Sequence, residues 1–183
     1  MTKSAVQVGF FTNLARLLDQ PGGKALIQSK VKQLVLMAGA FPNGKKEYNV
    51  YIDLPAANKV FAEWPTPIVT SGFEIGNTIK FPAVSIENDF RYATPHPVAE
   101  AYRNYMKMPY DRQTWDLTAV LYAVRPNRGY FGLSENGTII ADAEGVTTHT
   151  PNPAARQQYL TVTPEQRTRV LEALIQLASE PPH

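Results

Sequence analysis

The chain of 183 residues contains no cysteine and only three histidines. The lack of cysteine excludes disulfides, thiolate metal sites and cysteine nucleophiles. Because the three histidines are scattered along the sequence, a histidine-based zinc site is not expected either. Any bound metal would have to be held by oxygen ligands, which favours calcium or magnesium.

Long apolar runs and a strong excess of one charge are also missing. No stretch approaches the roughly 18–20 apolar residues of a membrane-spanning helix, so no membrane partner is expected. The formal net charge is only +2 and the basic residues are scattered, so nucleic acid is not a predicted partner. The one short basic pair, Lys45-Lys46, is typical of a solvated loop tip.

The first 20 residues lack the apolar core that a signal peptide needs before its cleavage site. This predicts a cytoplasmic protein. A signal peptide lost from upstream of residue 1 stays an open alternative.

The composition is that of an ordinary folded domain, with 44% hydrophobic and 19% charged residues. We expect residues 1–183 to form a single domain. Apolar runs over residues 5–11, 31–37 and 67–72 are typical of strands, and helical patterns over 14–18, 25–29 and 56–64 separate them. Strands that alternate with helices predict βαβ units, and therefore an α/β fold with a Rossmann-like parallel sheet.

The second half of the sequence has a different character. Residues 74–95 look irregular, and helices are expected over 98–106 and 114–124. Turn signals at Asn136-Gly137 and Glu144-Gly145 predict a small antiparallel meander over residues 130–162. The capping box Thr163-Pro164-Glu165-Gln166 predicts the start of a C-terminal amphipathic helix.

Three parallel strands are few for a whole sheet, since sheets commonly have about five or six. The sheet therefore looks incomplete, with strands missing on its N-terminal side. We expect the open edge to be a contact for an N-terminal half or for a second copy of the chain.

A polar loop follows the strand over residues 31–37. The loop ends at Asp53 and Pro55, which are expected to open the next helix. A strand that leads into a polar loop before a helix is where open α/β sheets place their ligands. The segment from Met37 to Ala57 is therefore the main candidate for a binding site.

Four motifs, in the same order, resemble the inosine-uridine type nucleoside hydrolases. They are Gly9-Phe-Phe-Thr-Asn-Leu-Ala15, Val35-Leu-Met-Ala-Gly-Ala-Phe41, Glu47-Tyr-Asn49 with Asp53-Leu-Pro-Ala-Ala57, and Trp115-Asp116-Leu-Thr-Ala-Val120. Each motif alone would be weak, whereas the ordered set is specific. The resemblance covers nearly the whole chain but only the C-terminal part of the family's usual length.

The resemblance implies hydrolysis of the N-glycosidic bond of ribonucleosides, with a calcium ion that holds the ribose diol and an attacking water. Thr12 would offer its backbone carbonyl to calcium, and Asp116 its carboxylate. The implied ribose-binding residues are Met37 at the floor of the site, Glu47 and Asn49 at the sugar hydroxyls, and Asn43 as an additional loop asparagine.

Two departures from the family matter. The family's Asp-x-Asp-x-x-x-Asp-Asp cluster supplies most calcium ligands and the aspartate that activates water, and it does not occur in these 183 residues. No catalytic residue is therefore assigned in this chain, and calcium is expected only together with the segment that carries the cluster. Trp115 stands where family members carry a histidine proposed to protonate the leaving base. Because indole has no titratable proton near neutrality, Trp115 would stack on the base or belong to the core.

Each candidate residue also has a purely structural interpretation. Thr12 and Asn13 would cap a helix, Met37 would fill the core, Glu47 would be solvated, and Asp116 would favour a helix N-terminus. The ordered motifs favour a nucleoside hydrolase-like protein that binds ribonucleosides and is inactive alone. The alternative is a non-catalytic ribose- or nucleoside-binding module, or a remnant interaction domain.

Overall fold

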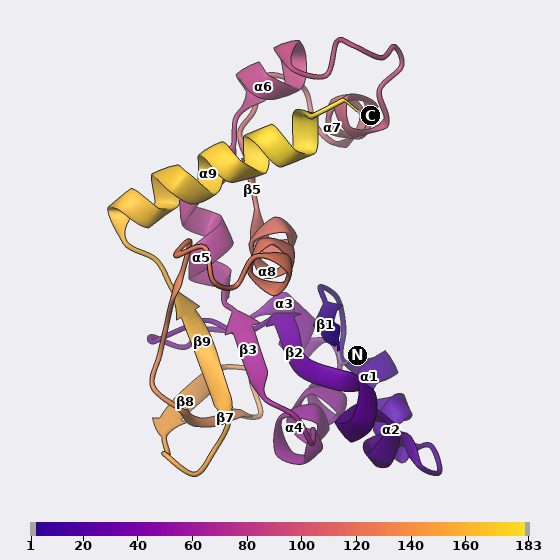
Figure 1. Ribbon diagram of the computed structural model, residues 1–183, viewed down its shortest axis with the longest axis vertical. Coiled ribbons are helices and arrows are strands. Elements are labelled where there is room, and N and C mark those ends of the chain that lie inside the picture. Colours follow the sequence, from indigo (N-terminus) through magenta and orange to yellow (C-terminus); the bar gives the residue numbers. More distant parts are fainter. Residues whose placement is uncertain (1–2, 182–183) are drawn as a thin grey trace.

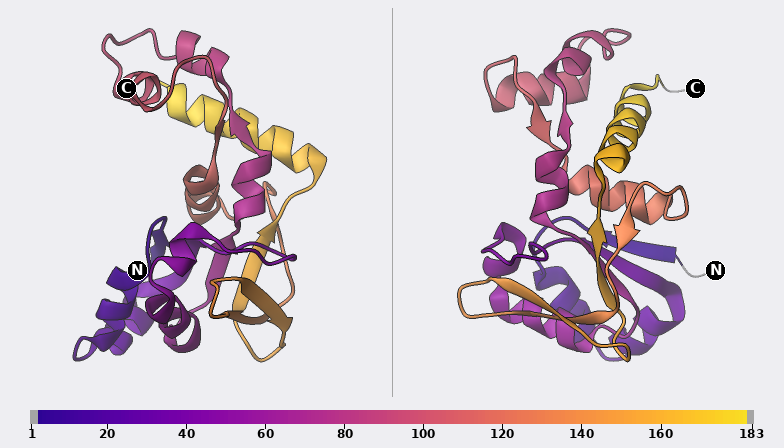
Figure 2. Two further views of the ribbon diagram at one scale, coloured as in Figure 1. Left: turned by 180° about the vertical axis from the view of Figure 1, so that it is seen from behind. Right: turned by 90° about the vertical axis from the view of Figure 1, so that its left-hand side faces the viewer.

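A mixed sheet runs through the computed structural model, which describes residues 3–181 (Figures 1 and 2). Its strand order is β1-β2-β3-β9-β7-β8, and β6 pairs with β9. The four parallel strands are β1 (Lys3–Gln7), β2 (Val31–Met37), β3 (Ile68–Ser71) and β9 (Gln157–Thr161). The antiparallel strands are β6 (Gly132–Leu133), β7 (Gly137–Ala141) and β8 (Thr147–Pro151). The predicted α/β fold with a parallel core is confirmed.

Helices cover both faces of the sheet, as the alternating side chains of β2 show. Leu34 and Leu36 pack with α1 (Thr12–Asp19), α2 (Gly23–Lys30) and α4 (Leu54–Glu63). Val35 and Met37 point to the opposite layer, which contains α5 (Phe73–Thr78), α8 (Trp115–Val124) and α9 (Pro164–Ser179). Because successive residues of a strand face opposite sides, a strand buried on both faces reads as a continuous apolar run.

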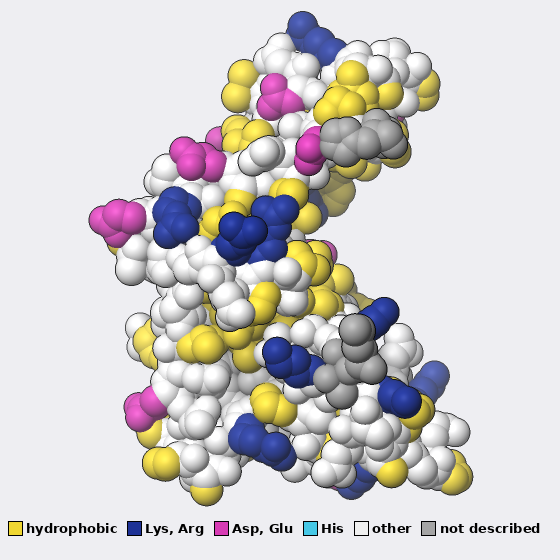
Figure 3. All heavy atoms as spheres, viewed as in Figure 1, with side chains coloured by type: hydrophobic (Ala, Val, Ile, Leu, Met, Phe, Trp, Pro, Cys, Tyr) yellow, Lys and Arg dark blue, Asp and Glu magenta, His cyan; other side chains and the backbone are white. Residues whose placement is uncertain are grey.

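A smaller cluster lies at the far end of α9, away from the sheet (Figure 1). It joins α6 (Ala83–Asn88) and α7 (Pro97–Tyr105) to a two-stranded ribbon of β4 (Lys80–Phe81) and β5 (Arg112–Gln113). Phe81, Ile86 and Phe90 form its buried centre. The molecule is hollowed on one side between this cluster and the sheet, and hydrophobic side chains gather along the hollow (Figure 3).

Several local predictions are confirmed by hydrogen bonds. Asp53 caps α4 by accepting from the Ala56 amide, with Pro55 in the first turn. Thr163 and Gln166 form the reciprocal capping box at the start of α9. The Glu144-Gly145 turn connects β7 and β8, and Gly145 has a φ of 81°, a conformation that favours glycine.

Other local predictions are wrong. The first strand ends at Gln7 rather than residue 11, and α1 follows Phe11 with no side-chain cap from Thr12 or Asn13. The segment over residues 74–95, expected to be irregular, contains most of α5 as well as β4 and α6. The last strand of the expected meander, β9, pairs in parallel with β3 and so becomes a fourth parallel strand.

Strand β1 lies at one edge of the sheet within the described residues. Val6 on β1, and Val8 and Phe10 just after it, have side chains that are 38–40% exposed. The unpaired edge expected from the sequence therefore lies along β1. Across residues 3–181, no helix is both long and apolar enough to cross a membrane.

Candidate functional site

A cavity of about 660 Å³ opens where three neighbouring strands end. Val8 follows β1, Met37 ends β2 and Phe73 follows β3, so the cavity lies at the carboxyl ends of the parallel strands. We call it the strand-end cavity. Its lining residues are Val8, Met37, Lys45, Lys46, Glu47, Tyr48, Asn49, Tyr51, Phe73, Trp115 and Asp116. This position is the one expected for a ligand of an open α/β sheet.

Five of the seven residues proposed from the sequence meet in this cavity, namely Met37, Glu47, Asn49, Trp115 and Asp116. The other two lie elsewhere. Asn43 is exposed in the loop after β2. Thr12 begins α1, and its hydroxyl donates a hydrogen bond to Asp53 Oδ2 instead. Thr12 thereby connects α1 to the cap of α4.

Glu47 is buried, with 4% of its surface exposed, and is not the solvated loop residue of the structural interpretation. Its Oε1 accepts from the Asn49 amide at 3.1 Å, and its Oε2 accepts from the amides of Gly39 and Val50 at 3.1 and 3.3 Å. It thus caps the short helix α3 (Tyr48–Tyr51). Burial raises the pKa of the Glu47 carboxyl, and the backbone amides oppose this effect only in part.

Asn49 fastens α3 to the ends of two strands. Its side-chain NH₂ donates to the Met37 carbonyl at 3.0 Å and to the Val8 carbonyl at 3.4 Å, and it lies 3.1 Å from Met37 Sδ. Met37 is itself part of the core layer beneath α8. Met37 therefore fills the core and also lines the cavity, so both interpretations of this residue hold.

The loop after β2 is fixed by side chains from three separate parts of the chain. The consecutive amides of Gly39, Ala40 and Phe41 donate to Glu47, to Thr147 Oγ1 at 3.0 Å and to Glu74 Oε2 at 2.9 Å. Gly39 has a φ of 73°, and a Cβ there would lie 2.9 Å from both Phe41 and Thr147. Only glycine fits this turn without strain.

Glu74 is a residue that the sequence did not reveal. Its Oε1 is buried without a hydrogen-bond partner in the described structure. Burial raises the pKa of the Glu74 carboxyl, while the Phe41 amide and nearby Lys45 lower it. The partly buried carboxylate of Glu74 therefore holds the same loop as Glu47, at a different amide.

Trp115 is positioned by contacts between α5 and the start of α8. Its indole Nε1 donates to the Phe73 carbonyl at 3.0 Å, and the two rings lie 5.4 Å apart. A Cβ on Gly76 would approach the Trp115 backbone to 2.4 Å, so the close packing of α5 on α8 requires glycine. The buried hydroxyls of Ser71 and Thr118, 2.8 Å apart, tie α8 to β3.

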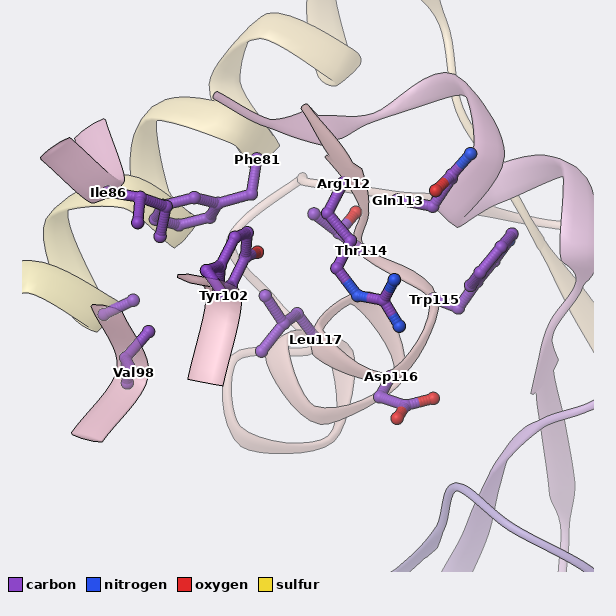
Figure 4. Close-up of a pocket in the computed structure, with 11 residues that line it drawn as sticks. Phe81, Ile86, Val98, Tyr102, Arg112, Gln113, Thr114, Trp115, Asp116 and Leu117 are labelled. Atoms are coloured by element: carbon purple, nitrogen blue, oxygen red, sulfur yellow. The ribbon is translucent and has the colours of Figure 1, made fainter. Parts of the chain in front are cut away.

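Asp116 lies in the first turn of α8, on the boundary between the strand-end cavity and a second cavity of about 300 Å³. Figure 4 shows Arg112 extending toward Asp116 inside this second cavity, with Phe81 and Tyr102 along its apolar wall. Partial desolvation raises the pKa of Asp116, and the Arg112 guanidinium opposes it. Thr114 precedes the helix but donates its hydroxyl to the Ile79 carbonyl at 2.8 Å rather than capping α8.

The described residues do not fit calcium on their own. Calcium takes about six to eight oxygen ligands, whereas residues 3–181 contain no group of three or more His, Asp or Glu side chains placed to hold a metal. Asp116 lines the strand-end cavity, but the Thr12 carbonyl belongs to the first residue of α1, where carbonyls accept from the amide four residues on.

Sequence reasoning also missed several residues that line the strand-end cavity. Tyr48, Tyr51 and Phe73 add aromatic walls, and Lys45 and Lys46 add positive charge. The basic pair is exposed, as a loop tip should be, yet it also borders the cavity. A signal was present for Lys45, Lys46, Tyr48 and Tyr51, which lie within the segment from Met37 to Ala57, but not for Phe73, which follows the next strand.

Comparison with known proteins agrees with this geometry. The profile of the family described as inosine-uridine preferring nucleoside hydrolase matches residues 2–174. The chain therefore belongs to the inosine-uridine preferring nucleoside hydrolase family. A search of curated proteins found no match.

Several solved structures share the fold. An inosine-guanosine nucleoside hydrolase has a TM-score of 0.74 and 17% identity, over 99% of this chain and 63% of that one. The inosine-uridine preferring nucleoside hydrolase of Bacillus anthracis has a TM-score of 0.68 and 20% identity, over 96% and 61%. The type III effector XopQ, solved with adenosine diphosphate ribose, has a TM-score of 0.62 and 16% identity, over 98% and 62%. The chain thus spans about three fifths of the length of these structures.

Proposed function

We propose that the strand-end cavity binds ribonucleosides through their ribose. The observation that carries this proposal is the meeting of Met37, Glu47, Asn49, Trp115 and Asp116, from three separate segments, in one cavity at the strand ends. Family membership gives the ligand class. Carboxylate and amide groups suit sugar hydroxyls, and the aromatic walls suit a nucleobase.

The residues have different roles in this proposal. Glu47 and Asn49 are positioning residues as well as binding residues, because their hydrogen bonds to Gly39, Val50, Met37 and Val8 fix the shape of the cavity floor. Asp116 presents a carboxylate from the first turn of α8. Trp115 offers a ring face to the base, since its indole N–H is already engaged by Phe73.

We further propose that hydrolysis of the N-glycosidic bond needs a segment that contributes additional carboxylates. The whole enzyme would then be a nucleoside N-ribohydrolase, with this chain supplying the ribose site and with calcium bound only after completion. Asp116 would be this chain's calcium ligand. Partial desolvation raises the pKa of Asp116. The charge of a bound metal ion would nevertheless hold its carboxyl deprotonated.

The alternative function is a ribose- or nucleoside-binding module without catalysis. One observation favours it specifically. The Glu47 carboxylate already accepts three backbone amides, so it works as a structural anchor and has little acceptor capacity left for chemistry.

Fluorescence titration tests the ribose proposal, because Trp115 lines the cavity while Trp64, the only other tryptophan, is buried in the opposite core layer. Inosine and uridine should change the emission, and hypoxanthine, which lacks ribose, should bind at least about tenfold more weakly. The signal should vanish in Trp115→Phe, with binding then followed by calorimetry. Equal affinities for inosine and hypoxanthine would rule out recognition through the ribose.

A further inference from the structure

The wall of the strand-end cavity next to Glu47 is positively charged. Lys45 and Lys46 directly precede Glu47 in the chain, and both line the cavity. Two ammonium groups are more than a neutral nucleoside needs, since its ribose hydroxyls are satisfied by uncharged donors and acceptors. The lining also contains two carboxylates, but Glu47 accepts three backbone amides and Asp116 faces the charge of Arg112. Two lysines beside carboxylates that have other partners suggest that the natural ligand brings an anion.

The two lysines are held by aromatic rings rather than by carboxylates. Lys45 Nζ lies 3.1 Å from the centroid of Phe73, and Lys46 Nζ lies 4.1 Å from the centroid of Tyr51. Among residues 3–181, the lysines that form ion pairs within 4 Å are Lys24 and Lys59. A ring face attracts an ammonium without using its three N–H donors as a carboxylate would.

The acidic groups near these lysines are largely committed to other partners. Glu47 accepts three backbone amides. Glu74, which Lys45 influences electrostatically, accepts from Phe41 through one oxygen, and its other oxygen is buried. Burial raises the pKa of both carboxyls. Lys45 and Lys46 are therefore available to a ligand at the mouth of the cavity.

We propose that the strand-end cavity takes a 5′-phosphorylated ribose, with Lys45 and Lys46 binding the phosphate. This inference rests on the proposed ribose site and extends it from nucleosides to nucleotides or ribose phosphates. A phosphomonoester carries roughly 1.5 to 2 negative charges near neutrality. Lysine binds such a group as a point charge, and the rings of Phe73 and Tyr51 keep both charges beside the sugar position instead of free in solvent.

The test compares four ligands on the full chain by calorimetry: inosine, inosine 5′-monophosphate, ribose 5-phosphate and inorganic phosphate. Inosine 5′-monophosphate should bind at least about tenfold more tightly than inosine. This advantage should shrink steeply with added salt, because exposed charges are screened within about 10 Å at 0.1 M ionic strength. If ribose 5-phosphate matches the nucleotide, the sugar phosphate is the recognised unit, and if it is weaker, the base contributes as well.

The variant Lys45→Gln/Lys46→Gln should lose the phosphate advantage while still binding inosine. The matched control is Lys30→Gln/Lys32→Gln, which removes the same charge from two exposed lysines at the end of α2 and the start of β2. The control should keep the advantage. The salt dependence of the unmodified chain gives a second measurement that requires no variant to fold.

The outcomes separate the two proposals. Inosine binding with no gain from the 5′-phosphate would overturn the phosphate inference alone, as would a gain that survives in Lys45→Gln/Lys46→Gln. Inorganic phosphate binding as tightly as ribose 5-phosphate would show an anion site unrelated to ribose. Failure of every ribose ligand to bind would overturn the ribose site and this inference together.

Discussion

Two carboxylates, the buried Glu47 and the partly buried Glu74, determine the shape of the loop between β2 and α3. Each accepts an amide of that loop, Gly39 in one case and Phe41 in the other. Desolvation raises the pKa of both groups. A carboxyl with a raised pKa in the folded state stabilises the fold when protonated, below its ordinary value of 4.5, and loses this contribution as the pH rises through the raised value.

Glu74→Gln should therefore stabilise the chain at neutral pH. The amide keeps an acceptor for the Phe41 N–H and replaces a partly unpaired buried charge with a neutral group. At pH 7 we expect the melting temperature to rise by a few degrees, since about 1 kcal/mol corresponds to about 2–4 °C for a chain of this size. The gain should disappear toward pH 4, where the glutamate is protonated in both states.

Thermal melts from pH 4 to pH 8 check this prediction, with Glu172→Gln as the control because Glu172 is exposed on α9. A gain that is independent of pH would show that the charge of Glu74 is not the cause. A loss of stability at neutral pH that fades toward pH 4 would mean that the attraction of the ionised Glu74 to Lys45 outweighs its burial cost.

Asp116 allows a sharp distinction between a helix-end role and a ligand-binding role. In its structural role, Asp116 interacts with the N-terminus of α8, a contribution of about 0.3–1 kcal/mol that desolvation of the carboxyl partly cancels. Asp116→Asn should hardly change the melting temperature on this account. If Asp116 is a calcium ligand of the completed enzyme, the same change should strongly reduce both calcium affinity and turnover.

Calcium calorimetry on the completed enzyme decides between the two roles. Asp89→Asn is a suitable control, because Asp89 is exposed at the end of α6. Equal calcium affinities for the Asp116 variant and the unmodified protein would remove Asp116 from the metal site.

Among the secondary-structure elements, the exposed edge of β1 is the feature with consequences for association. Val6 lies on β1 with 38% exposure, and Val8 and Phe10 extend the apolar surface beyond the strand. An unpaired apolar edge strand is a template for pairing with another chain. We predict that the isolated chain self-associates through this edge in a concentration-dependent way.

Sedimentation of Val6→Lys tests this prediction, because a charge on the edge should shift the chain toward monomer. Leu26→Lys is the control, since Leu26 is exposed on α2, a helix that packs against α1 and β2. A monodisperse monomer of the unmodified chain, with a sharp cooperative melt, would contradict the prediction.

The elements differ in how far the sequence determined them. Strand β2 was predicted with the observed bounds, Val31–Met37, because an apolar run buried on both faces is a strong local signal. The caps at Asp53 and Thr163 were equally local. The parallel pairing of β9 with β3 was not predictable from a local pattern, because it depends on contacts between residues about 90 positions apart.

The candidate site shows the same limit. The motifs predicted which residues would meet, and five of them line one cavity. They did not show that Glu47 would be buried, because that burial depends on amides from Gly39 and Val50. Glu74 was missed for the same reason, since its partner Phe41 lies 33 positions away. Thr12 was expected to cap α1, but its hydroxyl donates a hydrogen bond to Asp53 Oδ2 instead.

At the scale of the whole molecule, the chain by itself offers few free carboxylates to a metal ion. The strand-end cavity holds Glu47 and Asp116 as its carboxylates, and the former is occupied by backbone amides. We therefore predict that the purified chain neither binds calcium tightly nor hydrolyses inosine or uridine. Too few free oxygen ligands are present to strip calcium of its water.

The same reasoning predicts what would restore activity. The open edge of β1 is adjacent to Val8, which lines the strand-end cavity, so a strand added there would bring its following loop to the cavity mouth. Mixing the chain with the remaining segment of a related nucleoside hydrolase should produce calcium-dependent turnover of inosine that saturates near one segment per chain. Val6→Lys should weaken this complementation by hindering edge pairing, whereas Leu26→Lys should not. Turnover by the purified chain alone, proportional to its concentration and abolished by Asp116→Asn, would instead show that the cavity is catalytically sufficient as it stands.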